Sequence, residues 1–176
     1  RGYNLEIKDN YKFKKTLIIY NFFTEDLKDN ILNSRNKIKV GKNSEVHTID
    51  FIINKSKYKF MNNVYENVVL GNNAVYKNIC IQKDKSQGYF HKFSKNQLLS
   101  KSKYSTFIFP SGFKFNKLDL EFNLEGENSV CNIQSAAFLN ENDHQEIKTR
   151  VNHLYPNCKS YQKVKNVLNA ESKGVY

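Results

Sequence analysis

The chain has 176 residues, a formal net charge of +11, three cysteines and no tryptophan. That length suits one domain with one core, and no apolar run is long enough for a membrane span or patterned as a signal peptide. We therefore expect a single soluble, cytoplasmic domain over residues 1–176. The chain begins at Arg1 and ends at Tyr176 directly after a strand-like run, so we expect this domain to be truncated at both ends.

The cysteines and the basic charge bear on whether the protein is disulfide-rich, zinc-binding or nucleic-acid-binding. Cys80, Cys131 and Cys158 are an odd number, lie far apart and form no CxxC pair, which argues against a disulfide framework and a zinc knuckle. We expect reduced thiols. The charge comes almost entirely from lysine, without an arginine cluster or the aromatic motifs of RNA-binding domains, so no nucleic-acid partner is expected.

Most of the chain has the pattern of short β-strands. The β-rich runs are residues 15–23, 38–40, 46–53, 67–70, 75–81, 104–109, 118–124 and 147–153. The pattern is clearest where Leu118, Leu120, Phe122 and Leu124 alternate with polar residues, because alternation places one apolar face against a core. Many short strands separated by turn residues predict an all-β domain.

Two segments have a pattern that is closer to a helix. Residues 24–34 place three apolar residues behind a possible cap at Thr24, which predicts a helical turn or a loop. Residues 160–168 place Val164 and Val167 at helical spacing after a serine, so the local pattern alone predicts a helix there.

The strand pattern leaves the architecture open among a sandwich, a closed barrel and a solenoid of stacked coils. Two-residue hairpin turns of the Asn-Gly or Asp-Gly type are absent, and the segment Gly71-Asn72-Asn73 is the nearest approximation. Because antiparallel strands favour such turns, their absence favours parallel coils.

Residues 149–176 carry a dense motif. It runs T-x-V-x-H, two residues, P-x-C-x-S-x-Q, and later S-x-G-V, beginning at Thr149 and closing at Val175. This motif resembles the signature of the SufD family of iron-sulfur cluster assembly proteins. Residues 35–46 and 63–82 agree more weakly with the same family, so the resemblance spans nearly the whole chain. The sister subunit SufB has a different tail, with an S-I-S-K run and a Tyr-Arg-Gly turn that this chain lacks.

The resemblance implies a fold. Its members have a right-handed parallel β-helix, a solenoid in which stacked coils bury their own apolar faces. We therefore expect residues 160–168 to form part of a coil, with Val164 and Val167 on different faces or at a corner. A continuous helix over residues 162–169 would contradict the resemblance.

The resemblance also implies a function. This domain would be a non-catalytic scaffold rather than an enzyme, pairing with SufB through the β-helix and working with the SufC ATPase, which binds a helical region absent from this chain. The segment itself would bind no cofactor, and the whole complex would handle the iron-sulfur cluster transiently. The family's proposed cluster-forming Cys and His residues lie beyond the end of this chain, so no catalytic, cofactor-binding or metal residue is assigned here.

The cysteines and histidines allow sharper hypotheses than this. His153 and Cys158 could ligate a metal or form a Cys-His nucleophile. However, an odd separation places two strand residues on opposite faces unless Pro156 turns the chain between them, so we expect structural packing. Cys80 and Cys131 lie in apolar surroundings and are expected to be small core residues.

Two further possibilities concern carboxylates. His144 lies in what looks like an acidic polar loop that could hold a metal, although a solvated turn is the simpler interpretation, and His47 and His91 are isolated. Asp119, Glu121, Glu125 and Glu127 could serve a carbohydrate-binding or polysaccharide-cleaving β-helix as acid and base. Solvation of one outward strand face is the ordinary explanation, and no phosphate-binding loop, nucleophile elbow or HExxH motif is present.

Overall fold

The computed structural model describes all residues, 1–176, and consists almost entirely of parallel β-strands in two sheets. The odd sheet contains β1 (Asn4–Ile7), β3 (Ile31–Val40), β5 (Met61–Leu70), β7 (Ser86–Leu98), β9 (Phe113–Leu124), β11 (His144–His153) and β13 (Lys173–Val175). The even sheet contains β2 (Leu17–Phe23), β4 (Glu45–Asn54), β6 (Val75–Lys83), β8 (Lys103–Phe109), β10 (Val130–Leu139) and β12 (Lys159–Leu168).

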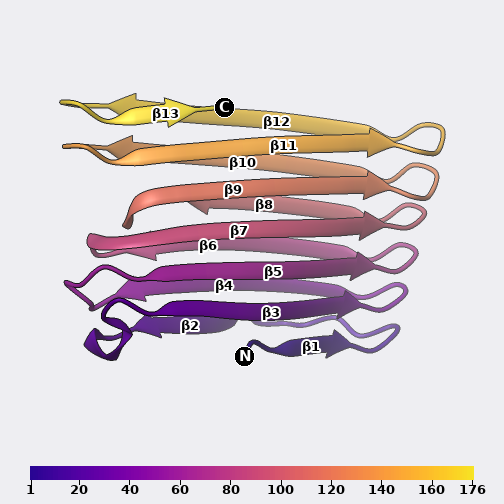
Figure 1. The fold of residues 1–176 in the computed structure, drawn as a ribbon. Helices are drawn as coiled ribbons and strands as arrows, with labels where there is room; N and C mark the ends of the chain where they lie inside the picture. The colour runs from indigo at the N-terminus through magenta and orange to yellow at the C-terminus, as the bar shows by residue number, and fades with distance from the viewer.

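The chain winds as a solenoid of about six turns. Each turn contributes one strand to each sheet, and the two sheets face each other across the interior (Figure 1). The chain runs along the front sheet, crosses at a corner, returns along the back sheet and rises by one strand, which is a right-handed path. The expectation of a right-handed parallel β-helix is confirmed.

Alternation along each strand builds the core. In β9, Leu118, Leu120, Phe122 and Leu124 are all buried, as their spacing predicted. In β4 every second residue is buried over the whole strand. Because strand side chains point alternately to the two faces, each coil sends one set of residues inward and leaves the other set outside.

The corner after each odd strand repeats one backbone feature. A residue there has a positive φ between 56° and 60°, at Asn10, Asn43, Asn73, Lys101, Asn128 and Asn157. Asparagine tolerates this left-handed conformation better than most residues. The Asn43 side chain donates to Asn10 Oδ1 at 2.9 Å, and Asn73 donates to Asn43 Oδ1 at 2.9 Å. Much of the asparagine in this chain therefore serves turns and ladders between coils.

Close approach of successive corners requires a residue without a side chain. A Cβ atom at Gly126 would overlap the backbone of Ser100 in the coil before it, and Gly41 and Gly71 are similarly crowded by the preceding corner. The segment Gly71-Asn72-Asn73, the nearest approximation to a hairpin turn in the sequence, is thus a corner between parallel coils.

Residues 24–34 match the prediction only in part. A single 3₁₀ turn, η1 (Glu25–Leu27), follows Thr24, but β3 already begins at Ile31. The Thr24 hydroxyl donates to the Asp26 side chain at 3.3 Å and makes no capping hydrogen bond to the backbone. The prediction that Thr24 caps a helix was therefore wrong. The helical turn is short because residues from Ile31 onward pair with β5.

Residues 160–168 belong to β12, so the helix that the local pattern predicts does not form. β12 pairs in parallel with β10 from Lys159 to Leu168. Val164 packs against the core, whereas Val167 is exposed on the opposite face. Their helical spacing is coincidental, as the resemblance implied.

The sequence pattern missed two long strands, β7 and β10. Both carry polar or small residues at inward positions, namely Ser94 and Asn96 in β7 and Ser135 and Ala137 in β10. A strand whose inward face is polar does not show apolar alternation, so periodicity alone could not detect it.

Candidate functional site

A cluster of ionisable side chains lies inside the β-helix. Asp50 of β4 and Cys80 of β6 point inward from the even sheet, and Glu66 of β5 and Lys92 of β7 point inward from the odd sheet. Asp50 and Cys80 are register partners on adjacent strands. We call these four residues the inner polar cluster.

An ion pair joins the two members from the odd sheet. Lys92 Nζ lies 2.6 Å from Glu66 Oε1, and both side chains are largely buried. Burial is the largest influence on the pKa of Lys92 and acts to lower it, but Glu66, Cys80 and Asp50 together outweigh burial, so the pKa is raised and the lysine stays charged. Ser94 Oγ also donates to Glu66 Oε1, at 3.4 Å. The buried carboxylate is therefore compensated by a cation and a hydroxyl.

Asp50 is less completely satisfied. The Asn78 side-chain amide donates to Asp50 Oδ2 at 2.6 Å, whereas the buried Oδ1 atom has no hydrogen-bond partner. Burial, followed by the charge of Glu66, raises the pKa of Asp50 to about 6. The carboxyl group can therefore hold or release a proton near neutral pH.

The Cys80 thiol, unlike the Asp50 carboxyl group, does not titrate near neutral pH. Burial raises its pKa to about 12, so the sulfur stays protonated at neutral pH. A thiol, unlike a thiolate, is a poor nucleophile and a poor metal ligand. The cluster can donate and accept hydrogen bonds and hold a proton, but Cys80 is not activated for attack.

A cavity of about 390 Å³ leads from the first coil to the inner polar cluster. Beyond the cluster, its walls include Tyr3, Asn21, Leu32 and Asn62. The cavity forms here because β1 pairs only with the last four residues of β3, as Figure 1 shows, and leaves the rest of that strand uncovered. Polar groups of the cluster thus face a space large enough for several water molecules.

His153 and Cys158 do not form a joint site. His153 Nε2 lies 3.0 Å from Ser160 Oγ, across the corner that contains Pro156. Cys158 Sγ lies 3.3 Å from Ser129 Oγ and 3.3 Å from the Gly126 carbonyl oxygen in the coil before. The two residues therefore have separate partners.

The position of Cys158 has a simple structural explanation. It directly follows the positive-φ residue of its corner, and the equivalent positions in earlier coils hold Ser44, Ala74, Ser102 and Ser129, all buried. A column of small residues fills the interior behind these corners. Cys158 continues the column, which supports the interpretation of structural packing.

The other two cysteines are buried as expected. Cys131 is inaccessible to solvent in β10, and burial, followed by the neighbouring Cys158, raises its pKa to about 12. Cys80 is also buried, but it belongs to the inner polar cluster and does not lie in a purely apolar core.

The histidines outside the motif each pair with one carboxylate on an outward face. His47 Nε2 lies 2.9 Å from Glu45, and His91 Nε2 lies 2.8 Å from Asp119. His144 Nε2 lies 3.1 Å from Glu146. His144 begins β11 instead of lying in a loop, because parallel pairing with β9 starts at that residue.

The carboxylates of the polysaccharide hypothesis also have local partners. Asp119 pairs with His91, and Glu121 accepts from Asn123 at 3.0 Å. Glu125 accepts from Gln97 at 3.3 Å, and Glu127 lies exposed at a corner. These contacts fit a solvated strand face.

No three His, Cys, Asp or Glu side chains come close enough together to hold a metal ion. None of the helical segments is long and apolar enough to cross a membrane.

Comparison with protein families gives one match. A family model described as "SUF system FeS cluster assembly, SufBD core domain" matches residues 22–176. The chain belongs to the SufB/SufD core-domain family. Its role therefore lies in the assembly of iron-sulfur clusters. No curated protein and no solved structure showed significant similarity to the chain.

Sequence reasoning did not find the inner polar cluster of this SufB/SufD core. The alternation of β4 is misleading here, because Ile49, Phe51 and Ile53 alternate with Thr48, Asp50 and Asn54, and this pattern places Asp50 on the solvent face. In the structure Asp50 points inward, where a charged residue needs a partner. The partner of Glu66 could not be found from the pattern either, since Lys92 lies in β7, a strand that the pattern missed.

Proposed function

We propose that this chain is the core of a SufD-type subunit and acts as a non-catalytic scaffold in iron-sulfur cluster assembly. In this role it pairs with SufB through the β-helix and works with the SufC ATPase through a separate helical region, in the cytoplasm. The cluster is a substrate that the whole complex handles transiently, and this segment binds no cofactor of its own.

The motif in residues 149–176 supports the choice of SufD over SufB. Its Thr149, His153, Cys158, Ser160 and Gln162 positions all match the SufD signature in one register. The S-I-S-K run and the Tyr-Arg-Gly turn of SufB are both absent. The family match itself applies to the core that both subunits share.

The contacts that the motif residues make with one another support a scaffold role, and they are the main observation behind the proposal. Thr149 Oγ1 lies 3.1 Å from the Tyr176 hydroxyl, which donates to Gln162 Oε1 at 2.7 Å. His153 forms a hydrogen bond with Ser160, and Cys158 packs beside Ser129 in the column of small residues behind the corners. These side chains join β11, β12 and the end of the chain across the last coil, so the motif fixes the geometry of the coil.

Co-purification of the full-length tagged protein with SufB and SufC, co-expressed from the same organism, tests the assignment. We expect a stable complex that contains both partners. Recovery of neither partner would remove the SufD assignment. A complex that contains only copies of this protein and SufC, without SufB, would favour a SufB-type subunit.

A second experiment tests the non-catalytic part. The variants H153A and C158S, assembled into the complex, should form clusters at a rate within about twofold of the unaltered complex, because neither side chain is used as a ligand or nucleophile. A fall of more than about a hundredfold in either variant, with the complex intact by gel filtration, would show that the residue takes part in the chemistry.

A further inference from the structure

The outward face of the even sheet carries two parallel rows of apolar side chains. The first row contains Ile18, Ile49, Ile79 and Phe107, which are register partners across β2, β4, β6 and β8. With neighbouring strands about 4.8 Å apart, this row is about 14 Å long.

The second row lies two residues further along the same strands. It contains Tyr20, Phe51, Ile81 and Phe109, again in register. The rings of Tyr20 and Phe51 stack with their centroids 5.3 Å apart. Tyr20 is 56% exposed and Phe109 is 41% exposed. We call the two rows together the apolar face.

Lysines surround this face. Lys77 and Lys103 stand at the start of β6 and β8, and Lys83 stands at the end of β6, all pointing outward and exposed. Lys163 and Lys165 extend the cationic margin along β12. None of these five lysines forms an ion pair. Glu45, the one carboxylate among the outward strand residues of this sheet, pairs with His47, and Asp84, which follows β6, pairs with Lys55.

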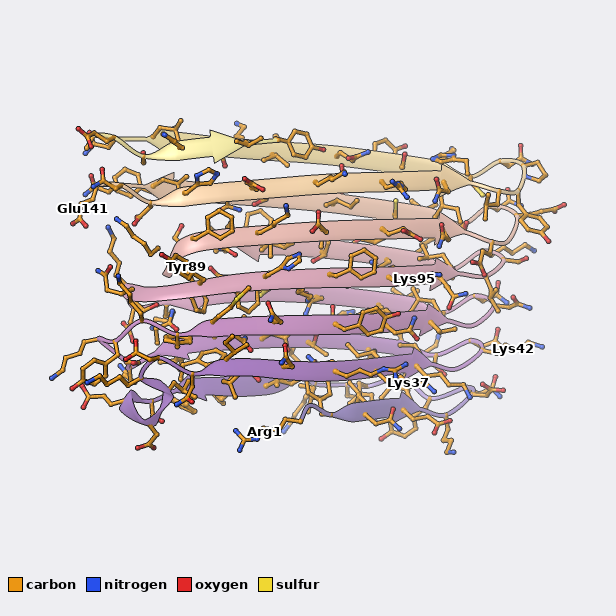
Figure 2. The ribbon with its side chains drawn as sticks, in the orientation of Figure 1. Arg1, Lys37, Lys42, Tyr89, Lys95 and Glu141 are labelled. Carbon is orange, nitrogen blue, oxygen red and sulfur yellow. The ribbon has the colours of Figure 1, made fainter.

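The outward face of the odd sheet is different. Several of its charges pair with one another, as in Lys39 with Glu6 at 3.3 Å and Lys117 with Glu146 at 3.2 Å. Figure 2 views this face, with Lys37 and Lys95 among the polar side chains that stand on it. The odd sheet therefore has carboxylates among its basic residues, whereas the outward strand residues of the even sheet include only Glu45.

We propose that the apolar face binds an acidic amphipathic segment of a partner protein. Exposed apolar patches with a polar rim commonly mark protein interfaces. A helix with an apolar stripe could lie across the two rows, and Asp or Glu beside that stripe would meet the unpaired lysines. Charge complementarity selects an acidic partner.

A protein surface fits the apolar face better than a lipid surface does. Most of its side chains are only half exposed, so they lie flush against their neighbours on the sheet and do not project as wedges. The chain also lacks tryptophan, the residue most typical of membrane interfaces. A flush apolar surface is suited to packing against another ordered surface.

Fluorescence anisotropy on the full-length protein tests the proposal. The probe is a labelled amphipathic helical peptide of about 18 residues, or about 27 Å of helix, with a leucine stripe flanked by glutamates. A second peptide replaces the glutamates with lysines. We expect the acidic peptide to bind at least about tenfold more tightly than the basic one.

Matched variants locate the binding. The pair K77E/K83E leaves every apolar side chain in place and should weaken the acidic peptide by about tenfold or more. The matched pair K37E/K148E places the same change on the odd sheet and should leave binding within about twofold. A third variant, Y20S/F109S, removes apolar area, and circular dichroism checks its folding.

Three outcomes would overturn the proposal. The first is binding of the acidic peptide that is no tighter than binding of the basic one, and the second is a loss of binding in K37E/K148E as large as that in K77E/K83E. The third is sedimentation of the protein with phosphatidylserine vesicles without binding of the acidic peptide, which would assign the apolar face to a membrane.

Discussion

The interior of the β-helix differs between its first and second halves. Between β4 and β7 the inward positions include the inner polar cluster, and a cavity of about 390 Å³ reaches it. From Asn116 of β9 onward the inward positions hold no Asp, Glu, Lys or Arg, and Leu118, Leu120, Phe122 and Leu124 share one apolar core with Ile133 of β10.

The difference shows that one fold can hold its coils together in two ways. The backbone ladders are the same in both halves, since every coil pairs in parallel with the next. In the second half, packing of apolar side chains adds to these ladders. In the first half, several inward side chains need specific partners, because a buried charge without one is strongly destabilising.

Removing one partner of the buried ion pair should have the largest effect. In K92M the Glu66 carboxylate loses its cation, and we expect a loss of about 3–5 kcal/mol in the free energy of unfolding. Urea unfolding followed by circular dichroism measures it. The double variant K92M/E66L should recover most of the loss, and a double variant as unstable as K92M would show that packing, not charge, holds these strands.

A large-to-small change in the apolar half sharpens the comparison. Leu124 is fully buried at the end of β9, so L124A should cost about 3 kcal/mol through lost burial and a residual cavity. The same unfolding experiment at pH 5 and pH 7 should give equal losses, since no ionisable group contributes. A loss that depends on pH would contradict the division between the halves.

The pH dependence of stability should come from Asp50. Its pKa is about 6 in the folded chain against an ordinary value of 3.8, so the folded state binds the proton more tightly. The wild-type protein should therefore lose up to about 3 kcal/mol relative to D50N as pH rises from about 4 to about 6. Unfolding of both proteins across this range measures the difference, and a constant difference would remove Asp50 as the source.

The smallest effect is expected at Cys158. Serine already fills the same corner position in three other coils, at Ser44, Ser102 and Ser129. C158S should therefore change the free energy of unfolding by about 0.5 kcal/mol or less. C131S is the matched change in the apolar interior and should cost about 2 kcal/mol, because a buried hydroxyl there would lack a partner. Equal effects of the two variants would contradict the corner-column interpretation.

The sequence allowed the strands with apolar inward faces to be predicted, together with the parallel β-helix that the motif in residues 149–176 implied. It did not reveal β7 and β10, whose inward residues Ser94 and Ser135 hide the alternation. At the candidate site, the sequence pattern groups Asp50 with Thr48 and Asn54 on the polar side of its strand and gives no sign of its burial. Its relation to Glu66, Cys80 and Lys92 was invisible, because residues from four strands meet there.

Local pattern by itself thus determined much of the strand content, the SufB/SufD family and the burial of Cys80 and Cys131. Alternation and a dense motif are properties of short stretches of chain, which a single sequence contains in full. Only the tertiary structure decided that residues 160–168 form β12, since parallel pairing with β10 outweighs a weak helical preference. It also decided which lysines remain unpaired around the apolar face and which carboxylates share the interior, because the winding of the coils brings residues about 30 positions apart into contact.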